Sequence, residues 1–198
     1  MERIRRGILV AAAGAVVLAI AGCATPAVRA GAEGSRAGIE VIGAGVVIDD
    51  GGGAQLCLGP VGLSDPPTCA GMPLSGWRWE GVDGVAERAG VRWGSWAVPG
   101  RWDGERLTVD GDAVPLALYD TTPFPWPAGT GPLSEADAAR IGAELAERWD
   151  GLLQSGPRDG RADVVVVFDD GTLQAEADAT YGEGAVVVTS ALRRLVEG

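Results

Sequence analysis

Carboxylates are the residues of this chain with the widest scope for chemistry, because histidine and lysine are both absent. All 16 basic side chains among the 198 residues are arginines, against 27 acidic side chains, which gives a formal net charge of −11. Without histidine there is no imidazole general base, no Ser-His-Asp or Cys-His pair and no histidine-ligated zinc site. Without lysine there is no Schiff-base chemistry, no P-loop lysine and no Ser-Lys dyad. Most enzyme classes are therefore excluded.

Aspartates could supply the remaining chemistry, as two adjacent pairs and three single residues: Asp49-Asp50, Asp169-Asp170, Asp103, Asp110 and Asp112. Such oxygen ligands suit calcium, but their spacing is not that of an EF-hand loop. Each pair directly precedes glycine, where aspartate favours turns. A glycosidase-like pair of carboxylates can be drawn from the same residues, although nothing in the sequence selects which two would face each other. We expect turns here, with no metal ion and no cofactor.

Tryptophan is the other unusual residue, with seven copies, of which five lie between Trp77 and Trp102. Exposed coplanar indoles would make a platform for sugar rings or another flat ligand, and the candidate ligand-binding residues are Trp77, Trp79, Trp93 and Trp102. Trp77 and Trp79 would share one face of a strand, whereas Trp93 and Trp96 would lie on opposite faces. The alternative, which the sequence favours for most of them, is that a small barrel with few other large apolar residues uses tryptophan as core.

The N-terminus places a basic segment, MERIRR, before a 16-residue apolar run that ends in Ile20-Ala21-Gly22 and Cys23. That run is shorter than the roughly 20 residues of a spanning helix, so it favours a signal peptide, residues 1–22. The four residues ending at Cys23 resemble the lipobox of bacterial lipoproteins. The resemblance implies cleavage before Cys23, a diacylglyceryl group on its sulfur, and anchoring at the extracytoplasmic face of the cell membrane. An ordinary signal peptide followed by a chance cysteine is the alternative.

Removal of the leader changes the charge of the chain, because Glu2 and three arginines leave with it and carry a net +2. The mature chain then carries −13 instead of −11, and residues 23–38 form the lipidated cysteine and a flexible tether. An acidic body is held off an anionic membrane surface. The negative net charge also argues against nucleic acid as a partner, since phosphate contacts need clustered basic residues.

Cys57 and Cys69 are the other two cysteines. With Cys23 lipidated, the remaining count is even and the compartment oxidising, so we expect a disulfide between them. Closing a loop of this size stabilises a fold by about 3 kcal/mol in the chain-entropy model. A redox-active pair is disfavoured because there is no CxxC spacing and no histidine or lysine to lower a thiol pKa.

Hydrophobic patterning divides the rest of the chain into two modules and predicts an α+β fold. Short β-branched runs separated by Gly and Asp over 39–119 predict a small antiparallel barrel, OB-like and stapled by the disulfide. A Pro-rich hinge follows at 120–133, and an αβ module covers 134–198. Strand and turn signals within the first module include DDGGG at 49–53.

The αβ module reads as a compact αβαβ unit. Ser134 opens a capping box, and Ile141, Leu145, Trp149 and Leu152 recur at helical spacing. Two apolar runs, 163–168 and 185–189, predict buried strands. The segment from Thr172 favours a helix capped by that residue, although alternation there leaves a hairpin open. A helix would make the two strands parallel.

The β module also carries a set of short motifs: Cys57-Leu58-Gly59, Pro66-Pro67-Thr68-Cys69-Ala70-Gly71, Gly76-Trp77-Arg78-Trp79, Trp93-Gly94 and Trp102-Asp103-Gly104. These resemble a module of exported actinobacterial lipoproteins that have no assigned function. That pattern often has an acidic residue between its two tryptophans, where this chain has Arg78. We therefore expect a non-catalytic envelope lipoprotein that binds a protein partner or an envelope glycan, with a carboxylate-based extracytoplasmic hydrolase as the alternative.

Overall fold

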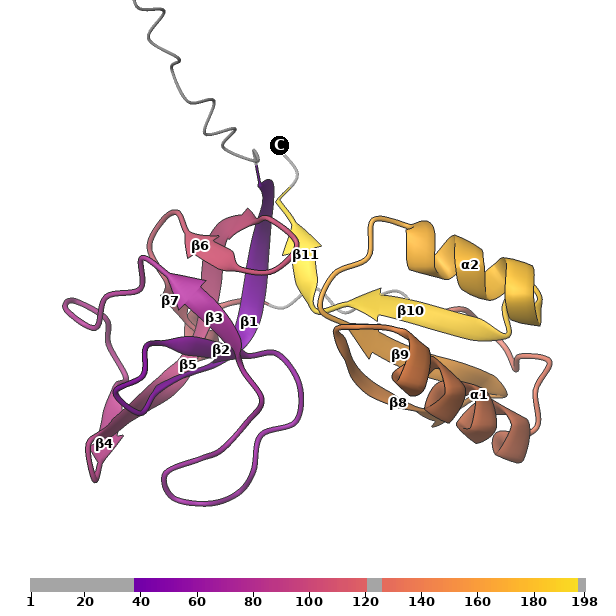
Figure 1. Cartoon of the computed structure of the whole chain (residues 1–198), viewed down its shortest axis with the longest axis horizontal. Helices are drawn as coiled ribbons and strands as arrows, with labels where there is room; N and C mark the ends of the chain where they lie inside the picture. Colours follow the sequence, from indigo (N-terminus) through magenta and orange to yellow (C-terminus); the bar gives the residue numbers. More distant parts are fainter. Residues whose placement is uncertain (1–37, 121–125, 196–198) are drawn as a thin grey trace, which may run out of the picture. The chain divides into compact units, whose positions relative to one another are not determined.

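The computed structural model describes residues 38–120 and 126–195. The leader, Cys23, the tether up to residue 37 and residues 121–125 of the predicted hinge lie outside the described residues. The described residues form two β-sheets and two α-helices, which confirms the α+β class (Figure 1). Within these ranges no helix is long and apolar enough to cross a membrane.

Five strands of the larger sheet close into a barrel in the order β1-β2-β3-β6-β5-β1. They are β1 (Ile39–Asp49), β2 (Gln55–Cys57), β3 (Met72–Ser75), β5 (Val91–Trp102) and β6 (Leu107–Val109). Four pairings are antiparallel, whereas β3 and β6 are parallel. The expectation of a purely antiparallel barrel is therefore wrong. Strand directions cannot alternate around a closed ring with an odd number of strands, so at least one neighbouring pair must be parallel.

Three short strands extend this sheet beyond the barrel: β4 (Ala86–Arg88), β7 (Val114–Pro115) and β11 (Leu192–Arg194). β4 and β7 both pair with β5, and a 3-10 turn, η1 (Leu116–Leu118), follows β7. β11 pairs with β1, and its Leu192 is fully buried in the barrel core. The sequence analysis predicted no strand at β11, although this segment lies in the range it assigned to the αβ module.

Strand β1 organises the barrel because it has neighbours along both edges. One edge pairs with β5 from Ile39↔Trp102 to Asp49↔Arg92, and the other is shared between β11 and β2. Gly43 and Gly45 lie where the partner changes. A Cβ at Gly45 would overlap the carbonyl oxygen of Cys57. Only glycine therefore allows β1 and β2 to approach each other this closely.

The smaller sheet has the strand order β10-β9-β8. Its elements are α1 (Glu135–Arg148), β8 (Leu152–Arg158), β9 (Arg161–Val166), α2 (Thr172–Tyr181) and β10 (Val186–Ser190). β9 and β10 are parallel and joined by α2, as predicted. The αβαβ order is wrong in one element, since β8 is an additional strand antiparallel to β9. Leu152, expected in the helix, begins β8 because Gly151 turns the chain with a φ of +77°.

Helix ends in this module are fixed by side chains. Ser134 Oγ accepts the backbone N–H of Asp137 at 3.1 Å, which confirms the predicted cap of α1. The predicted cap of α2 is wrong, because Thr172 is its first residue. Instead, Asp169 accepts the backbone N–H groups of Leu173 and Gln174 at 2.9 and 3.3 Å. The Asp169 carboxylate precedes the helix and can reach the N–H groups of its first turn. The Thr172 hydroxyl lies within that turn and cannot.

Gln174 of α2 protects the outer edge of β10. Its side-chain oxygen accepts the N–H of Val188 at 2.9 Å, and its amide nitrogen donates to the carbonyl of Val186 at 3.1 Å. One side-chain amide thus pairs with the strand as a neighbouring backbone would. Unpaired edge groups invite association with other chains, so this contact serves both stability and solubility.

Two separate apolar clusters hold the described residues together. The barrel cluster contains Val41, Val47, Leu56, Trp96, Val98, Leu107 and Leu192. The second cluster packs α1 and α2 against the smaller sheet through Ala138, Ile141, Leu145, Trp149, Val164, Val166, Ala177 and Val186.

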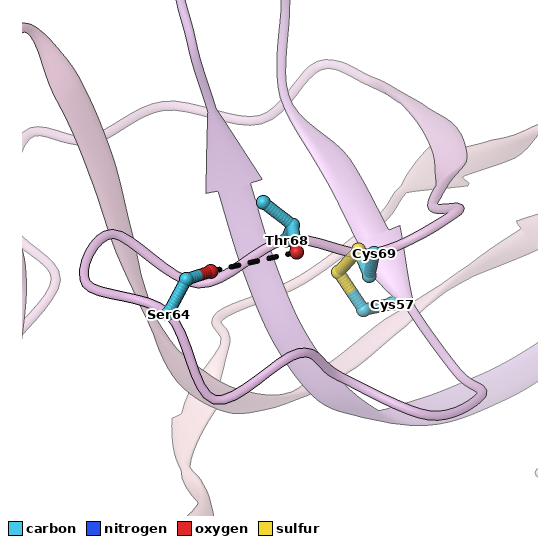
Figure 2. The surroundings of a disulfide bond; sticks show 4 residues. All are labelled: Cys57, Ser64, Thr68 and Cys69. Carbon is cyan, nitrogen blue, oxygen red and sulfur yellow. Dashed lines mark hydrogen bonds between the residues drawn. A yellow bond between two sulfur atoms is a disulfide. The ribbon is translucent and has the colours of Figure 1, made fainter.

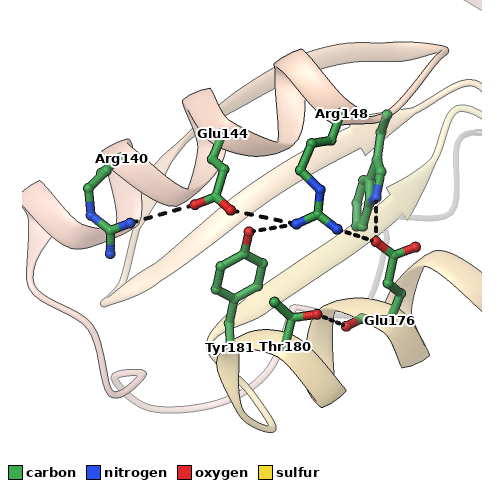
Figure 3. A network of polar contacts seen from close by, with 7 residues as sticks. Arg140, Glu144, Arg148, Glu176, Thr180 and Tyr181 are labelled. Atoms are coloured by element: carbon green, nitrogen blue, oxygen red, sulfur yellow. Dashed lines mark hydrogen bonds and ion pairs between the residues drawn. The ribbon is translucent and has the colours of Figure 1, made fainter.

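Polar side chains join the two helices of the smaller module (Figure 3). Arg148 of α1 donates to Glu176 of α2 at 2.8 Å and to the Tyr181 hydroxyl at 3.2 Å. Glu144 lies 3.6 Å from Arg148, one helical turn away on the same helix. Burial, with a smaller contribution from Glu144, raises the pKa of the Tyr181 phenol. Helix packing alone explains these contacts.

Candidate ligand-binding site at the barrel end

Cys57 and Cys69 form a disulfide, as predicted, with their Cα atoms 6.0 Å apart (Figure 2). Cys57 ends β2, and Cys69 lies in the loop that leads to β3. The bridge therefore closes a loop over residues 57–69 on the outside of the barrel, which we call the disulfide loop. A disulfide of this kind is typical of proteins that mature in an oxidising compartment.

The candidate tryptophans do not form one surface. Trp77 and Trp79 lie in the loop between β3 and β4, so the expectation that they share a strand face is wrong. Trp93 and Trp102 both lie on β5, nine residues apart, and Trp102 packs against the barrel core. Trp96 is fully buried, while Trp93, an odd number of positions away, is partly exposed, in agreement with the predicted opposite faces.

Trp77 and Trp79 instead meet Trp96, and we call these three residues the indole cluster. Ring centroids are 5.3 Å apart for Trp77 and Trp96, 5.5 Å for Trp77 and Trp79, and 5.9 Å for Trp79 and Trp96. Two of the three pairs meet edge to face, the geometry that favours aromatic contacts in a core. The cluster closes the barrel end rather than presenting a flat, exposed platform.

Asp49, the last residue of β1, fixes this cluster to the barrel. One oxygen accepts the N–H groups of Gly51 and Gly53 at 2.9 and 3.2 Å. The other accepts Trp79 Nε1–H at 3.0 Å and lies 3.4 Å from Arg92 Nη2. The Gly51 N–H, followed by the Trp79 indole, lowers the pKa of the Asp49 carboxyl below its usual value of 3.8. One carboxylate thus holds the DDGGG turn and the tryptophan loop together.

Hydrogen bonding differs among the three indoles of the cluster. Trp79 donates to Asp49, and Trp96 Nε1 donates to the carbonyl of Asp83 at 3.1 Å. The buried Trp77 Nε1 has no acceptor among the described residues. An unpaired buried donor costs on the order of 1–3 kcal/mol, so Trp77 is the member of the cluster whose hydrogen bonding a ligand could improve.

Trp77 also lines a pocket of about 250 Å³ at this end of the barrel. Its walls come from the loops that follow β3 and β6, two parallel neighbours whose following loops emerge at the same barrel end. The lining residues are Gly76, Trp77, Arg78, Glu80, Gly81, Val82, Val109, Gly111, Asp112 and Ala113. An indole beside a guanidinium and two carboxylates combines an apolar surface with hydrogen-bond donors and acceptors.

The sequence predicted Trp77 as a candidate ligand-binding residue but did not group it with the charged residues that share its pocket. Arg78 stood out only as a departure from the actinobacterial pattern, and Asp112 only as one of several candidate carboxylates. The parallel pairing of β3 and β6 brings their two loops together across about 30 residues of sequence. No short-range pattern encodes that pairing.

A second pocket, of about 290 Å³, lies between the disulfide loop and the barrel. It is lined by Ile48, Asp50, Gln55, Pro66, Pro67, Thr68, Cys69 and Val91. This pocket is more apolar than the first and contains none of the candidate tryptophans.

Most of the candidate carboxylates make local turn contacts. Asp103 accepts the N–H groups of Glu105 and Arg106, which lowers the pKa of its carboxyl. Asp110 pairs with Arg101 at 2.9 Å. Asp170 accepts the hydroxyl and N–H of Thr172, which lowers its pKa. Over residues 38–120 and 126–195, no three Cys, Asp or Glu side chains gather in a way that could hold a metal ion.

The fold and the site together describe an α+β protein with a closed, mixed five-stranded barrel, an indole cluster at one end and a polar pocket beside it. Comparison with protein-family models, with curated proteins and with solved structures finds no match to this chain. Function has to be argued from the geometry of the site.

Proposed function

We propose that this protein is a non-catalytic envelope lipoprotein that binds an envelope glycan in the pocket beside Trp77. Its leader and Cys23 carry the lipobox resemblance, which supports a lipid anchor at the extracytoplasmic face of the cell membrane. The Cys57–Cys69 disulfide supports the same compartment, because disulfides persist outside the reducing cytoplasm. The similarity to exported actinobacterial lipoproteins agrees with this location.

The barrel is OB-like in our interpretation. When its five strands are numbered in chain order, their order around the barrel is 1-2-3-5-4 and back to 1, and the third and fifth strands are parallel. OB-folds are small five-stranded Greek-key barrels that bind oligonucleotides and oligosaccharides through surface strands and connecting loops. The mature charge of −13 opposes an oligonucleotide, whose phosphates need basic contacts. An oligosaccharide has no such requirement.

The observation that carries the proposal is the composition of the pocket: Trp77 together with Arg78, Glu80 and Asp112. A sugar ring presents apolar C–H faces and a rim of hydroxyls. The indole suits the faces, while carboxylates accept and a guanidinium donates hydrogen bonds at the rim. A ligand oxygen could also accept the unpaired Trp77 N–H after a small shift of the loop.

A binding titration with matched variants tests this proposal. Lipid-free mature protein would be titrated with soluble fragments of the envelope polysaccharides, with tryptophan fluorescence as the readout. Arg78→Ala and Asp112→Ala, both exposed positions, should each weaken binding about tenfold, in line with the loss of one charge-assisted hydrogen bond. Arg106→Ala and Glu105→Ala, exposed on the β5–β6 hairpin, are the controls and should bind as the parent does. Equal affinity in all four variants would refute the site.

A hydrolase is the second candidate, because two carboxylates, Glu80 and Asp112, line the same pocket. Paired carboxyl groups across a bound sugar are the machinery of most glycosidases. Incubating the same polysaccharide fragments with the parent, Glu80→Gln and Asp112→Asn distinguishes the two functions. A binding protein leaves the fragments intact in every case. Cleavage by the parent that either substitution abolishes would establish the hydrolase instead.

A further inference from the structure

The disulfide loop presents one exposed apolar side chain, Leu63. Leu63 is fully exposed and is the most exposed large apolar residue in the described part of the chain. A leucine stabilises a fold when its side chain is buried, and the fold obtains no such contribution from Leu63. The side chain therefore has no structural task in the isolated protein.

Several contacts link the loop around Leu63 to itself and to the sheet. The Cys57–Cys69 bridge closes its base (Figure 2). Gly62 N–H donates to the carbonyl of Thr68 at 2.7 Å. The Ser64 and Thr68 hydroxyls lie 3.5 Å apart. Asp65 forms an ion pair with Arg88 of β4, which ties the loop to the sheet. Because these contacts form without a partner, they reduce the conformational entropy that the loop would lose on binding.

The 290 Å³ pocket adjoins this loop, since Pro66, Pro67, Thr68 and Cys69 of its second arm form one wall. The barrel residues Ile48 and Val91 add apolar surface, and Asp50 adds an acidic group. The same face of the protein therefore offers a projecting apolar side chain and an apolar recess. The surface of a partner protein can match both features. Its own pocket would receive Leu63, and one of its side chains would enter the recess.

We propose that the disulfide loop docks a second envelope protein, which receives Leu63 in an apolar pocket flanked by basic side chains. A glycan offers no such pocket. A lipid bilayer would accept a leucine, but anionic headgroups repel an acidic body with Asp50 beside the loop. The mature charge of −13 also disfavours a second copy of this chain and favours a basic partner.

Site-specific photo-cross-linking in living cells tests the docking surface. A benzophenone amino acid replaces Leu63 in the full-length chain, and in a control it replaces Leu118, an exposed leucine of η1. We expect one protein adduct from position 63 and none of the same species from position 118. Absence of any protein adduct at position 63, or adducts with lipid only, would overturn the proposal.

The affinity of the captured protein then decides whether Leu63 contributes to binding. Leu63→Ser should weaken binding about 10- to 100-fold, since a buried leucine side chain is lost, whereas Leu118→Ser should not. Binding by the parent should also weaken as salt is raised, because acidic and basic surfaces attract. Unchanged affinity for Leu63→Ser would refute the inference. Glycan binding should be normal in this variant, so failure of this inference is separable from failure of the proposed function.

Discussion

Replacing Asp49 with asparagine should destabilise the barrel and loosen the tryptophan loop. The carboxylate serves four donors: two backbone N–H groups of the DDGGG turn, the Trp79 indole and Arg92. Asparagine keeps a single acceptor oxygen, so it can retain the turn contacts or the Trp79 contact but not both. Asparagine is also neutral, so the ion pair with Arg92 is lost.

The expected cost follows from how buried these contacts are. Only 12% of the Asp49 side chain is exposed, and hydrogen bonds to charged groups contribute about 1.5–3 kcal/mol each. Arg92 is 39% exposed, so its pairing adds only about 0–1 kcal/mol. Allowing for the contacts that asparagine retains, we expect a loss of about 2 kcal/mol of unfolding free energy. For a body of this size that lowers Tm by about 4–8 °C.

Urea unfolding of the disulfide-intact protein, followed by tryptophan fluorescence, measures this loss. Asp50→Asn is the matched control, because Asp50 accepts one exposed contact, from Gly52 at 3.0 Å. Its cost should stay below about 0.5 kcal/mol. A double-mutant cycle between Asp49→Asn and Trp79→Phe should give a coupling energy near 1 kcal/mol. Equal costs for Asp49→Asn and Asp50→Asn, with no coupling to Trp79, would refute this reasoning.

The same carboxylate predicts a pH dependence. Its pKa in the folded protein is below 3.8, so the unfolded state takes up a proton more readily. The stability that Asp49 contributes is fully present above its unfolded pKa and is lost as the pH falls through the folded pKa. The difference in unfolding free energy between the parent and Asp49→Asn should therefore be constant at neutral pH and shrink below about pH 4. A difference that grows on acidification would contradict the assignment.

Three further outcomes are expected. Gly45→Ala should cost about 3 kcal/mol or prevent folding, because the new methyl group overlaps the Cys57 carbonyl; normal urea stability would contradict this. Gln174→Leu should cost about 2 kcal/mol and speed hydrogen exchange at Val188, whose N–H loses its acceptor; unchanged exchange would disprove edge pairing. Cys23→Ser should release the protein from the membrane fraction, and full retention would refute lipid anchoring.

Patterns in the sequence correctly predicted the elements that are stabilised by contacts between residues close together in the chain. The Ser134 cap, the two apolar strands joined by α2, and the disulfide each depend on residues close together in the chain or on simple counting. The capping contact spans three residues, and the parallel strands are adjacent units of one βαβ connection. These features were correctly predicted because the physics that stabilises them acts over short separations.

The features that the sequence did not predict depend on contacts between residues far apart in the chain. β3 has four residues and contains Pro73, so it lacks a strand pattern, and its pairing with β6 fixes the parallel contact of the barrel. β11 has three residues and pairs with a strand about 150 positions earlier. Trp77 and Trp79 were expected on a strand because alternate spacing suits one, yet contact with Trp96 holds them in a loop. The pocket residues Arg78, Glu80 and Asp112 could be grouped only after that loop was located.

The pocket beside Trp77 can be tested most directly through its indole N–H. In a two-dimensional nitrogen–proton NMR spectrum each tryptophan side chain gives its own signal, so the seven indoles report on seven places in the chain. Titration with soluble envelope polysaccharide fragments should shift the Trp77 signal strongly and saturably, while the signal of Trp102, a half-buried residue at the C-terminal end of β5 that does not line the pocket, stays in place. Saturable shifts at Trp93 or Trp102 with none at Trp77, or no shift of any indole, would contradict the glycan-binding account.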